Sequence, residues 1–171
     1  RFMAYGTQTI PRVDKICGPG NIFVNTAKRL VFGQVDIDMF AGPSEVIIIA
    51  DESSNPEFVA ADMLAQAEHD KLASAIVLAV GDDLARKIWE AADRRSDEAN
   101  RQAQLEGSMA NYCSVISVDS VDTAIAFSEE LAPEHLELCV ADPDAALDKI
   151  NNAGAVFMGN YSPEPLGDYL I

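Results

Sequence analysis

Cysteine and histidine are both scarce in this chain of 171 residues, which has three cysteines and two histidines. The cysteines, Cys17, Cys113 and Cys139, lie far apart in the sequence and form no C-x-x-C spacing. An odd count without paired spacing argues against a disulfide framework. We therefore expect three buried free thiols in a reducing cytoplasm.

Long apolar runs and positive charge are also lacking. No run approaches the roughly 18 apolar residues that a membrane span requires, and the first residues lack the basic and apolar segments of a signal peptide. The 12 basic side chains stand against 28 acidic ones, a formal net charge of −16 that repels a nucleic-acid backbone. We expect a soluble, cytoplasmic protein that binds neither membranes nor nucleic acid. Small cationic ligands or metal ions suit an acidic surface better, and the alternative is that the acidity only keeps the protein soluble. Because position 1 is not Met, we also expect a piece of a longer protein.

What the sequence does contain is a regular alternation of short β-branched runs with helical patterns, and 49% of its residues are hydrophobic. Strands separated by helices of this length indicate βαβ units. The run 45–51, EVIIIAD, has the continuous apolar character of a strand that is buried on both faces of a parallel sheet. The predicted strands are 13–17, 35–39, 45–51, 75–80, 112–118 and 155–159. The predicted helices are 22–32, 56–69, 82–105, 120–131 and 142–151.

This pattern predicts an α/β fold, an incomplete Rossmann-like and mostly parallel sheet with helices on both faces. The Gly-Pro turn in FAGPSE either joins two lobes, 1–43 and 44–171, or merely joins two strands. Ligands of such folds gather at the carboxyl ends of the strands, so we look for the site there.

A glycine-containing turn, CGPGN (17–21), follows a predicted strand and opens a helix. Its backbone amides could cradle a phosphate at the helix N-terminus. The third glycine of a dinucleotide fingerprint is absent, because position 23 is Phe. A tight turn that binds nothing remains the alternative.

The two histidines each lie beside other polar side chains. Gln66 and His69 are three residues apart on a predicted helix, so both could reach one metal ion, although His69 could equally be a favourable contact at the helix C-terminus. Glu134 and His135 follow Pro133 in a predicted loop, where an imidazole and a carboxylate suit proton transfer near neutral pH. Chance adjacency is the alternative for this pair.

Asp168 follows Gly167 close to the end of the chain. It is either an ordinary turn aspartate or a hard oxygen ligand that meets His69 in the fold. Taken singly, none of these signals identifies a site.

Five separated motifs, read together, are distinctive. They are AYGTQTIPRVDKICGPGNIFV (4–24), IDMFAGPSEVIIIAD (37–51), DMLAQAEHD (62–70), APEHLEL (132–138) and NAGAVFMGNYSPEPLGDY (152–169). In this order they resemble the histidinol dehydrogenase family over essentially the whole chain. The resemblance implies oxidation of L-histidinol to L-histidine through an aldehyde, with two molecules of NAD and one Zn²⁺ for each active site of a homodimer.

The resemblance also implies ligands for the metal and the substrate. Gln66, His69 and Asp168 are similar to zinc ligands of the family that also contact the substrate, and Ser44 is similar to a further substrate contact. In the family, zinc acts as a template that binds the substrate's imidazole and amine.

For the chemical steps, Glu134 and His135 resemble the acid–base pair of the family. His135, which also touches the substrate, would take the proton of the alcohol, and Glu134 would help to activate water for the second oxidation. Asn21 resembles a contact to NAD.

The chain departs from the family in length. Family members have a further N-terminal region and a C-terminal segment that supplies a last histidine and a glutamate across the dimer, and this chain has no third histidine. We therefore expect little zinc binding and little turnover from the chain alone. The alternative reading is a noncatalytic, truncated α/β module for ligand binding or assembly. A metal hydrolase has no support beyond the same ligands.

Overall fold

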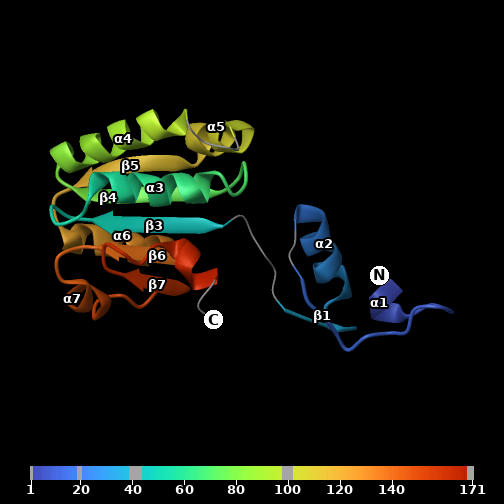
Figure 1. The fold of residues 1–171 in the computed structure, drawn as a ribbon. Coiled ribbons are helices and arrows are strands. Elements are labelled where there is room, and N and C mark those ends of the chain that lie inside the picture. Colours follow the sequence, from blue (N-terminus) through green and yellow to red (C-terminus); the bar gives the residue numbers. More distant parts are fainter. Residues whose placement is uncertain (1, 19–20, 39–43, 98–101, 169–171) are drawn as a thin grey trace. The chain divides into compact units, whose positions relative to one another are not determined.

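The computed structural model describes residues 2–18, 21–38, 44–97 and 102–168. The chain forms two compact units, Arg1–Gly42 and Pro43–Ile171, and each is described here by itself. Figure 1 shows the first in blue and the second in cyan to red.

The smaller unit is built from two short parallel strands and two helices, α1 (Phe2–Tyr5), β1 (Lys15–Ile16), α2 (Ile22–Val31) and β2 (Asp36–Ile37). The strands are shorter than the predicted 13–17 and 35–39, and Met39 lies outside the described residues. Lys28 is buried, and its Nζ atom donates hydrogen bonds to the carbonyl of Gly18 (2.8 Å) and to Asp38 Oδ1 (2.6 Å). The lysine thereby ties α2 to the chain segments that follow both strands.

The larger unit is a five-stranded, entirely parallel sheet with the strand order β5-β4-β3-β6-β7. Its helices lie on both faces, so the predicted fold class is confirmed (Figure 1). The strands are β3 (Glu45–Ala50), β4 (Ser74–Val80), β5 (Cys113–Val118), β6 (His135–Cys139) and β7 (Ala155–Met158). The helices are α3 (Pro56–Ala67), α4 (Asp82–Ser96), α5 (Gln102–Asn111), α6 (Val121–Leu131), α7 (Pro143–Leu147) and the 3₁₀ helix η1 (Glu164–Asp168).

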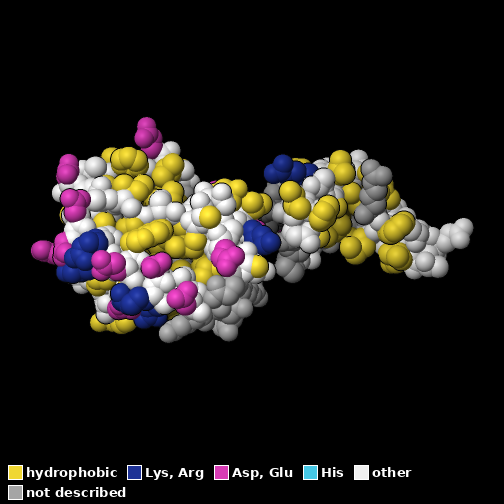
Figure 2. Space-filling view, turned by 90° about the horizontal axis from the view of Figure 1, so that it is seen from above, with side chains coloured by type: hydrophobic (Ala, Val, Ile, Leu, Met, Phe, Trp, Pro, Cys, Tyr) yellow, Lys and Arg dark blue, Asp and Glu magenta, His cyan; other side chains and the backbone are white. Residues whose placement is uncertain are grey.

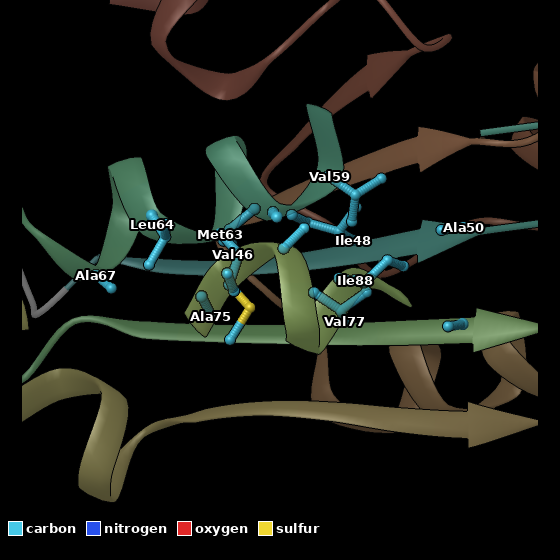
Figure 3. Close-up of a cluster of buried hydrophobic side chains, with 14 of the residues drawn as sticks. Val46, Ile48, Ala50, Val59, Met63, Leu64, Ala67, Ala75, Val77 and Ile88 are labelled. Atoms are coloured by element: carbon cyan, nitrogen blue, oxygen red, sulfur yellow. The ribbon is translucent and has the colours of Figure 1, made fainter. Parts of the chain in front are cut away.

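The central strand β3 is buried on both faces because its side chains alternate between two hydrophobic clusters. Val46 and Ile48 pack with residues of α3 and α4, as Figure 3 shows for Val59, Met63 and Ile88. Ile47 and Ile49 point to the opposite face, where they pack with residues of α6 and α7. The continuous apolar run therefore reflects two cores that share one sheet.

The start of α3 follows from its sequence. The Asn55 side chain accepts a hydrogen bond of 3.0 Å from the amide of Glu57, and Pro56 occupies the first helical position. Pro is favourable there because the first amides of a helix have no helical acceptor. The predicted helix start is confirmed.

Two predicted helices differ from those observed. The single helix 82–105 is two helices, α4 and α5, and residues 98–101 between them lie outside the described residues. The helix 142–151 is only the short α7, because the amides of Asn151 and Asn152 donate to the carboxylate of Glu129 (2.8 and 2.9 Å). These two amides therefore donate to the Glu129 side chain and not to the backbone carbonyls of a longer helix.

The surface carries charges of both signs. On the face seen in Figure 2, acidic and basic side chains of the larger unit are interspersed, and hydrophobic side chains are exposed on both units. The cysteines are free as expected, but only Cys139 is buried, whereas Cys113 is partly covered and Cys17 is exposed. Cys17 directly follows the two-residue strand β1, in a unit whose small core does not cover it. Among the described residues, no helix is long and apolar enough to cross a membrane.

Candidate active site at the amino edge of the sheet

Several of the predicted site residues lie near the amino ends of the parallel strands. Ser44 directly precedes β3, and its carbonyl accepts a hydrogen bond of 3.0 Å from the amide of Ser74, at the start of β4. His135 opens β6 and pairs in register with Val46 of β3. Helix α3 returns from the carboxyl end of β3 to the amino end of β4, so its last turn, with Gln66, lies at the same edge. The expectation of a site at the carboxyl ends is therefore wrong for these residues.

The carboxyl ends of β3 and β6, where the strand order reverses, are occupied by a side chain of the protein itself. Asp51 Oδ2 accepts a hydrogen bond of 2.9 Å from the amide of Ala141. Asp51 Oδ1 accepts from the amide of Ser53 (2.9 Å) and from its hydroxyl (2.6 Å). A carboxylate of the chain thus uses amides that would otherwise be available to a ligand at the switch point.

Gln66 and His69 differ sharply in exposure. Gln66 is 5% exposed, and its buried Nε2 atom has no hydrogen-bond partner among the described residues. His69 lies beyond the end of α3, in a turn closed by its amide donating to the carbonyl of Gln66 (3.1 Å), and its side chain is exposed. His69 is therefore not on the last helical turn as predicted, because α3 ends at Ala67.

His135 is the first residue of β6 and not part of a loop, as the sequence had suggested, whereas the exposed Glu134 does precede the strand. The chain turns into β6 through Ala132, whose left-handed conformation (φ 50°) ends α6 before Pro133. Strand β6 was not predicted. Its apolar run is interrupted by Glu137, and a charged residue at a central position argues against a strand that is buried on both faces.

The imidazole of His135 is partly buried between two side chains. The ring of Phe157, on the neighbouring strand β7, meets it edge to face, with centroids 5.9 Å apart. Oε1 of Glu164 lies 3.7 Å from Nδ1, which is too far for a direct hydrogen bond, and this buried nitrogen has no hydrogen-bond partner among the described residues. A carboxylate this near favours a proton on Nδ1, which leaves Nε2 as the basic atom.

Asp168 is the last residue of η1, and its side chain lies outside what the structure describes. The backbone of η1 is fixed against β6 and β7. The amide of Glu164 donates a hydrogen bond of 2.8 Å to Glu137 Oε1. Gly167 lies so close to Phe157 that a Cβ atom there would be 3.1 Å from the ring. The segment that carries Asp168 therefore packs on the same aromatic ring as His135.

Two further carboxyl groups, which were not predicted as site residues, lie on β6 and α3. Glu137 is 2% exposed in the middle of β6, and Asp62 is on α3, one turn before Gln66. Burial, followed by the charge of Asp62, raises the pKa of Glu137 to about 8. Burial raises the pKa of Asp62 to about 6. The sequence feature that could have indicated Glu137 is a glutamate inside an apolar run. This glutamate instead interrupts the apolar pattern by which a buried strand is predicted.

Asn21 belongs to the smaller unit and caps α2. Its Oδ1 atom accepts hydrogen bonds of 3.1 Å from the amides of Phe23 and Val24. This capping is the ligand-free explanation of the residue, so a bound dinucleotide would have to use the Nδ2 group.

No group of three or more His, Cys, Asp or Glu side chains suited to a metal ion occurs within the described ranges. Two predicted metal ligands have described side chains, Gln66 with its buried amide oxygen and His69 with its exposed imidazole. Both come from the end of α3, so a metal here would need further ligands from elsewhere.

Comparison with known proteins agrees with this architecture. The model of the family described as histidinol dehydrogenase matches residues 1–171. The histidinol dehydrogenase of Lactococcus lactis is 52% identical over 168 residues, which cover 98% of this chain and 39% of that protein. That of Aquifex aeolicus is 50% identical over 169 residues, which cover 99% of this chain and 40% of that protein.

Solved structures give the same result. The crystal structure of histidinol dehydrogenase from Elizabethkingia anophelis superposes with a TM-score of 0.91 at 42% identity, over 98% of this chain and 39% of that one. A gamma-glutamyl phosphate reductase from Thermotoga maritima, 12% identical with a TM-score of 0.54, shares the fold alone. This chain spans about 40% of the length of its relatives. By its sequence and its fold, the chain belongs to the histidinol dehydrogenase family.

Proposed function

We propose that this chain carries part of the active site of an enzyme that oxidises L-histidinol to L-histidine. The alcohol loses a hydride and a proton to give L-histidinal. The hydrated aldehyde then loses a second hydride and two protons to give the carboxylate, so that water supplies the added oxygen. NAD, when bound, would be the acceptor of each hydride. The observation that supports the proposal is that two separated family motifs, with Gln66 and His135, lie at the amino edge of one sheet.

In this proposal His135 accepts the proton of the substrate hydroxyl. Its Nδ1 atom faces Glu164, which favours the tautomer with a free Nε2 atom. The contact to Phe157 restricts the ring, so that the basic nitrogen does not need to be reoriented before reaction. Glu134, exposed at the start of the same strand, would hold or polarise the water for the second oxidation.

Gln66, His69 and Asp168 would hold a Zn²⁺ ion, and Ser44 would contact the substrate beside them. Gln66 would use its amide oxygen for the metal. Its buried Nε2 atom, a donor without a hydrogen-bond partner among the described residues, would be satisfied by an acceptor on the substrate and not by the cation. The metal would fix the imidazole and amine of the substrate and so hold the reacting carbon in place.

NAD would be contacted from the smaller unit by Asn21, and the complete enzyme would be a cytoplasmic homodimer that completes the metal site. A noncatalytic module remains a second candidate for the chain alone.

The experiment that tests the proposal is metal analysis together with an assay of NADH formation from L-histidinol. Both are applied to the 171-residue chain and to a protein of the relatives' length that contains it. We expect zinc and NADH formation in the longer protein. Their absence from a folded longer protein would favour the noncatalytic module.

A further inference from the structure

A charged side chain in the middle of a buried strand needs a physical reason. Glu137 is the only acidic residue among the buried ones that the structure describes, and in register it lies between Ile48 of β3 and Phe157 of β7. An unpaired carboxylate costs several kcal/mol at such a position. A leucine would fill this strand position without that cost. We therefore expect the carboxyl oxygens of Glu137 to make specific polar interactions.

The carboxyl group of Glu137 interacts with two other elements, η1 and α3. Oε1 accepts the hydrogen bond of 2.8 Å from the amide of Glu164, which begins η1. Oε2 receives no hydrogen bond from an N–H group or a hydroxyl among the described residues, and it is the Asp62 carboxyl of α3 that pairs with Glu137. Two carboxyl groups can pair in this way only when one of them carries a proton.

The surroundings favour that shared proton near neutral pH. The raised pKa values, about 8 for Glu137 and about 6 for Asp62, have burial as their first cause. The charge of Glu164, from η1, raises the pKa of both groups. The thiol of Cys139 on β6 is neutral, because burial, followed by the charges of Glu137 and Asp62, raises its pKa to about 12. The described residues that shift the pKa of the pair include no cation to stabilise two negative charges.

We propose that Glu137 is a positioning residue for His135, because its carboxyl, paired with Asp62, holds the start of η1 so that the Glu164 carboxylate faces Nδ1 of the imidazole. The chain of contacts runs from α3 through Asp62 and Glu137 to the backbone of Glu164, whose side chain reaches to 3.7 Å from His135 Nδ1. The role of His135 as a proton acceptor rests on the proposed function, whereas the hold on η1 does not.

Glutamine is the matched control for this role. A Gln at position 137 keeps the shape, accepts from the Glu164 amide through Oε1 and donates through Nε2 to Asp62, so it imitates the protonated glutamate. A Leu keeps the approximate volume and removes both hydrogen bonds. The pair Glu137→Gln and Glu137→Leu therefore separates hydrogen bonding from packing.

The test is amide hydrogen exchange by NMR in the 171-residue chain. We expect Glu137→Leu to raise the exchange rate of the Glu164 amide by about tenfold or more, and Glu137→Gln to keep it within about threefold of the wild type, while amides of β4 change in neither variant. If Glu137→Leu does not fold, Asp62→Ala removes the partner instead, and we expect the same local loosening.

The effect on His135 is read from the ¹⁵N chemical shifts of its imidazole, which distinguish the two neutral tautomers. The population protonated on Nδ1 should fall in Glu137→Leu and be restored in Glu137→Gln. In a protein of the relatives' length, kcat should follow the same order. The proposal would be overturned if Glu137→Leu left either the exchange rate of the Glu164 amide or the His135 tautomer unchanged. It would also be overturned if Glu137→Gln behaved like Glu137→Leu. Loss of only the kcat effect would count against the proposed function of His135 instead.

Discussion

Gly154 packs directly on the backbone of Glu134: a Cβ atom at position 154 would lie 2.6 Å from the Glu134 carbonyl oxygen. The two segments are joined on either side of this contact. The amide of Gly154 donates to the carbonyl of Pro133 (3.0 Å), and the amide of Ala155 donates to that of Glu134 (2.9 Å). The glycine is thus part of what fixes the start of β6, where both proposed acid–base residues lie.

Replacing Gly154 by Ala should therefore displace the Glu134–His135 segment. The added methyl group meets backbone, which cannot rotate away, so we expect a loss of about 1–3 kcal/mol in the free energy of unfolding. Urea unfolding followed by the fluorescence of Trp89, the only tryptophan, measures this loss in the larger unit. Gly107→Ala, within α5, is the control, since its Cβ would lie 3.4 Å from side-chain atoms of Lys71 and 3.8 Å from its Cα, which are distances of ordinary van der Waals contact. Equal stability of the two variants would contradict the steric argument.

The stability of the larger unit should fall as the pH rises through neutrality, because the pKa of Glu137 is raised from 4.5 to about 8 in the fold. The stabilisation is fully present below the unfolded pKa and is lost as the pH approaches the folded pKa, since in that range the folded state binds the extra proton. Between pH 6.5 and 9 we expect a loss of about 2 kcal/mol from this group.

The Glu137→Gln variant isolates this contribution. Because the Gln side chain does not titrate, the free energy of unfolding of this variant should change less over the same pH range than that of the wild type. The quantity to compare is the difference between the two proteins at each pH, measured by urea unfolding, which removes the general effect of the net charge. Parallel pH profiles would show that Glu137 does not titrate in this range.

Substitution of His135 by Asn should lower turnover much more than stability. Asn keeps a polar side chain at the start of β6 but cannot accept the proton, so kcat should fall by about 10²–10⁴-fold in a protein of the relatives' length. Steady-state kinetics with L-histidinol and urea unfolding of the same preparation measure the two effects. Equal losses of activity and stability would make His135 a structural residue.

Asp51 should be important for stability and not for catalysis. Its carboxylate joins the carboxyl ends of β3 and β6 through Ala141 and Ser53, so Asp51→Ala leaves backbone amides without their acceptor and should cost about 1–3 kcal/mol. Asp122→Ala is the control, because the Asp122 carboxylate forms an exposed ion pair with Lys149, and exposed pairs contribute little to stability. A preserved unfolding midpoint in Asp51→Ala would contradict this assignment.

Zinc should bind weakly, or not at all, to the 171-residue chain. A stable site has about four ligands, and the described donors at the end of α3 supply two at most. Metal analysis after dialysis should therefore give well below one zinc ion for each chain, and NADH formation from L-histidinol should be negligible. Full activity of the purified chain would refute this prediction.

Much of the fold was predictable because local and tertiary preferences agree. The run 46–50 is apolar without interruption, and it belongs to the strand with a core on each face. Asn55 and Pro56 begin a helix for reasons contained in four residues. Strand β6 was missed because its local and tertiary preferences disagree. The local pattern argues against Glu137 in a buried strand, whereas in the fold burial raises the pKa of this carboxyl, so that it keeps its proton, and the Glu164 amide donates to it.

The sequence by itself determined the family, the alternation of strands with helices and the polar residues worth examining, since all of these are carried by residue type and short-range spacing. Only the tertiary structure decided at which edge of the sheet those residues meet, because that depends on where each helix returns and on Asp51 occupying the opposite end. It also decided that His69 is exposed while Gln66 is buried, since α3 ends at Ala67 and leaves His69 in the turn beyond it. The residue at which a helix ends, and whether a buried carboxyl keeps its proton, depend on contacts between segments that lie far apart in the chain.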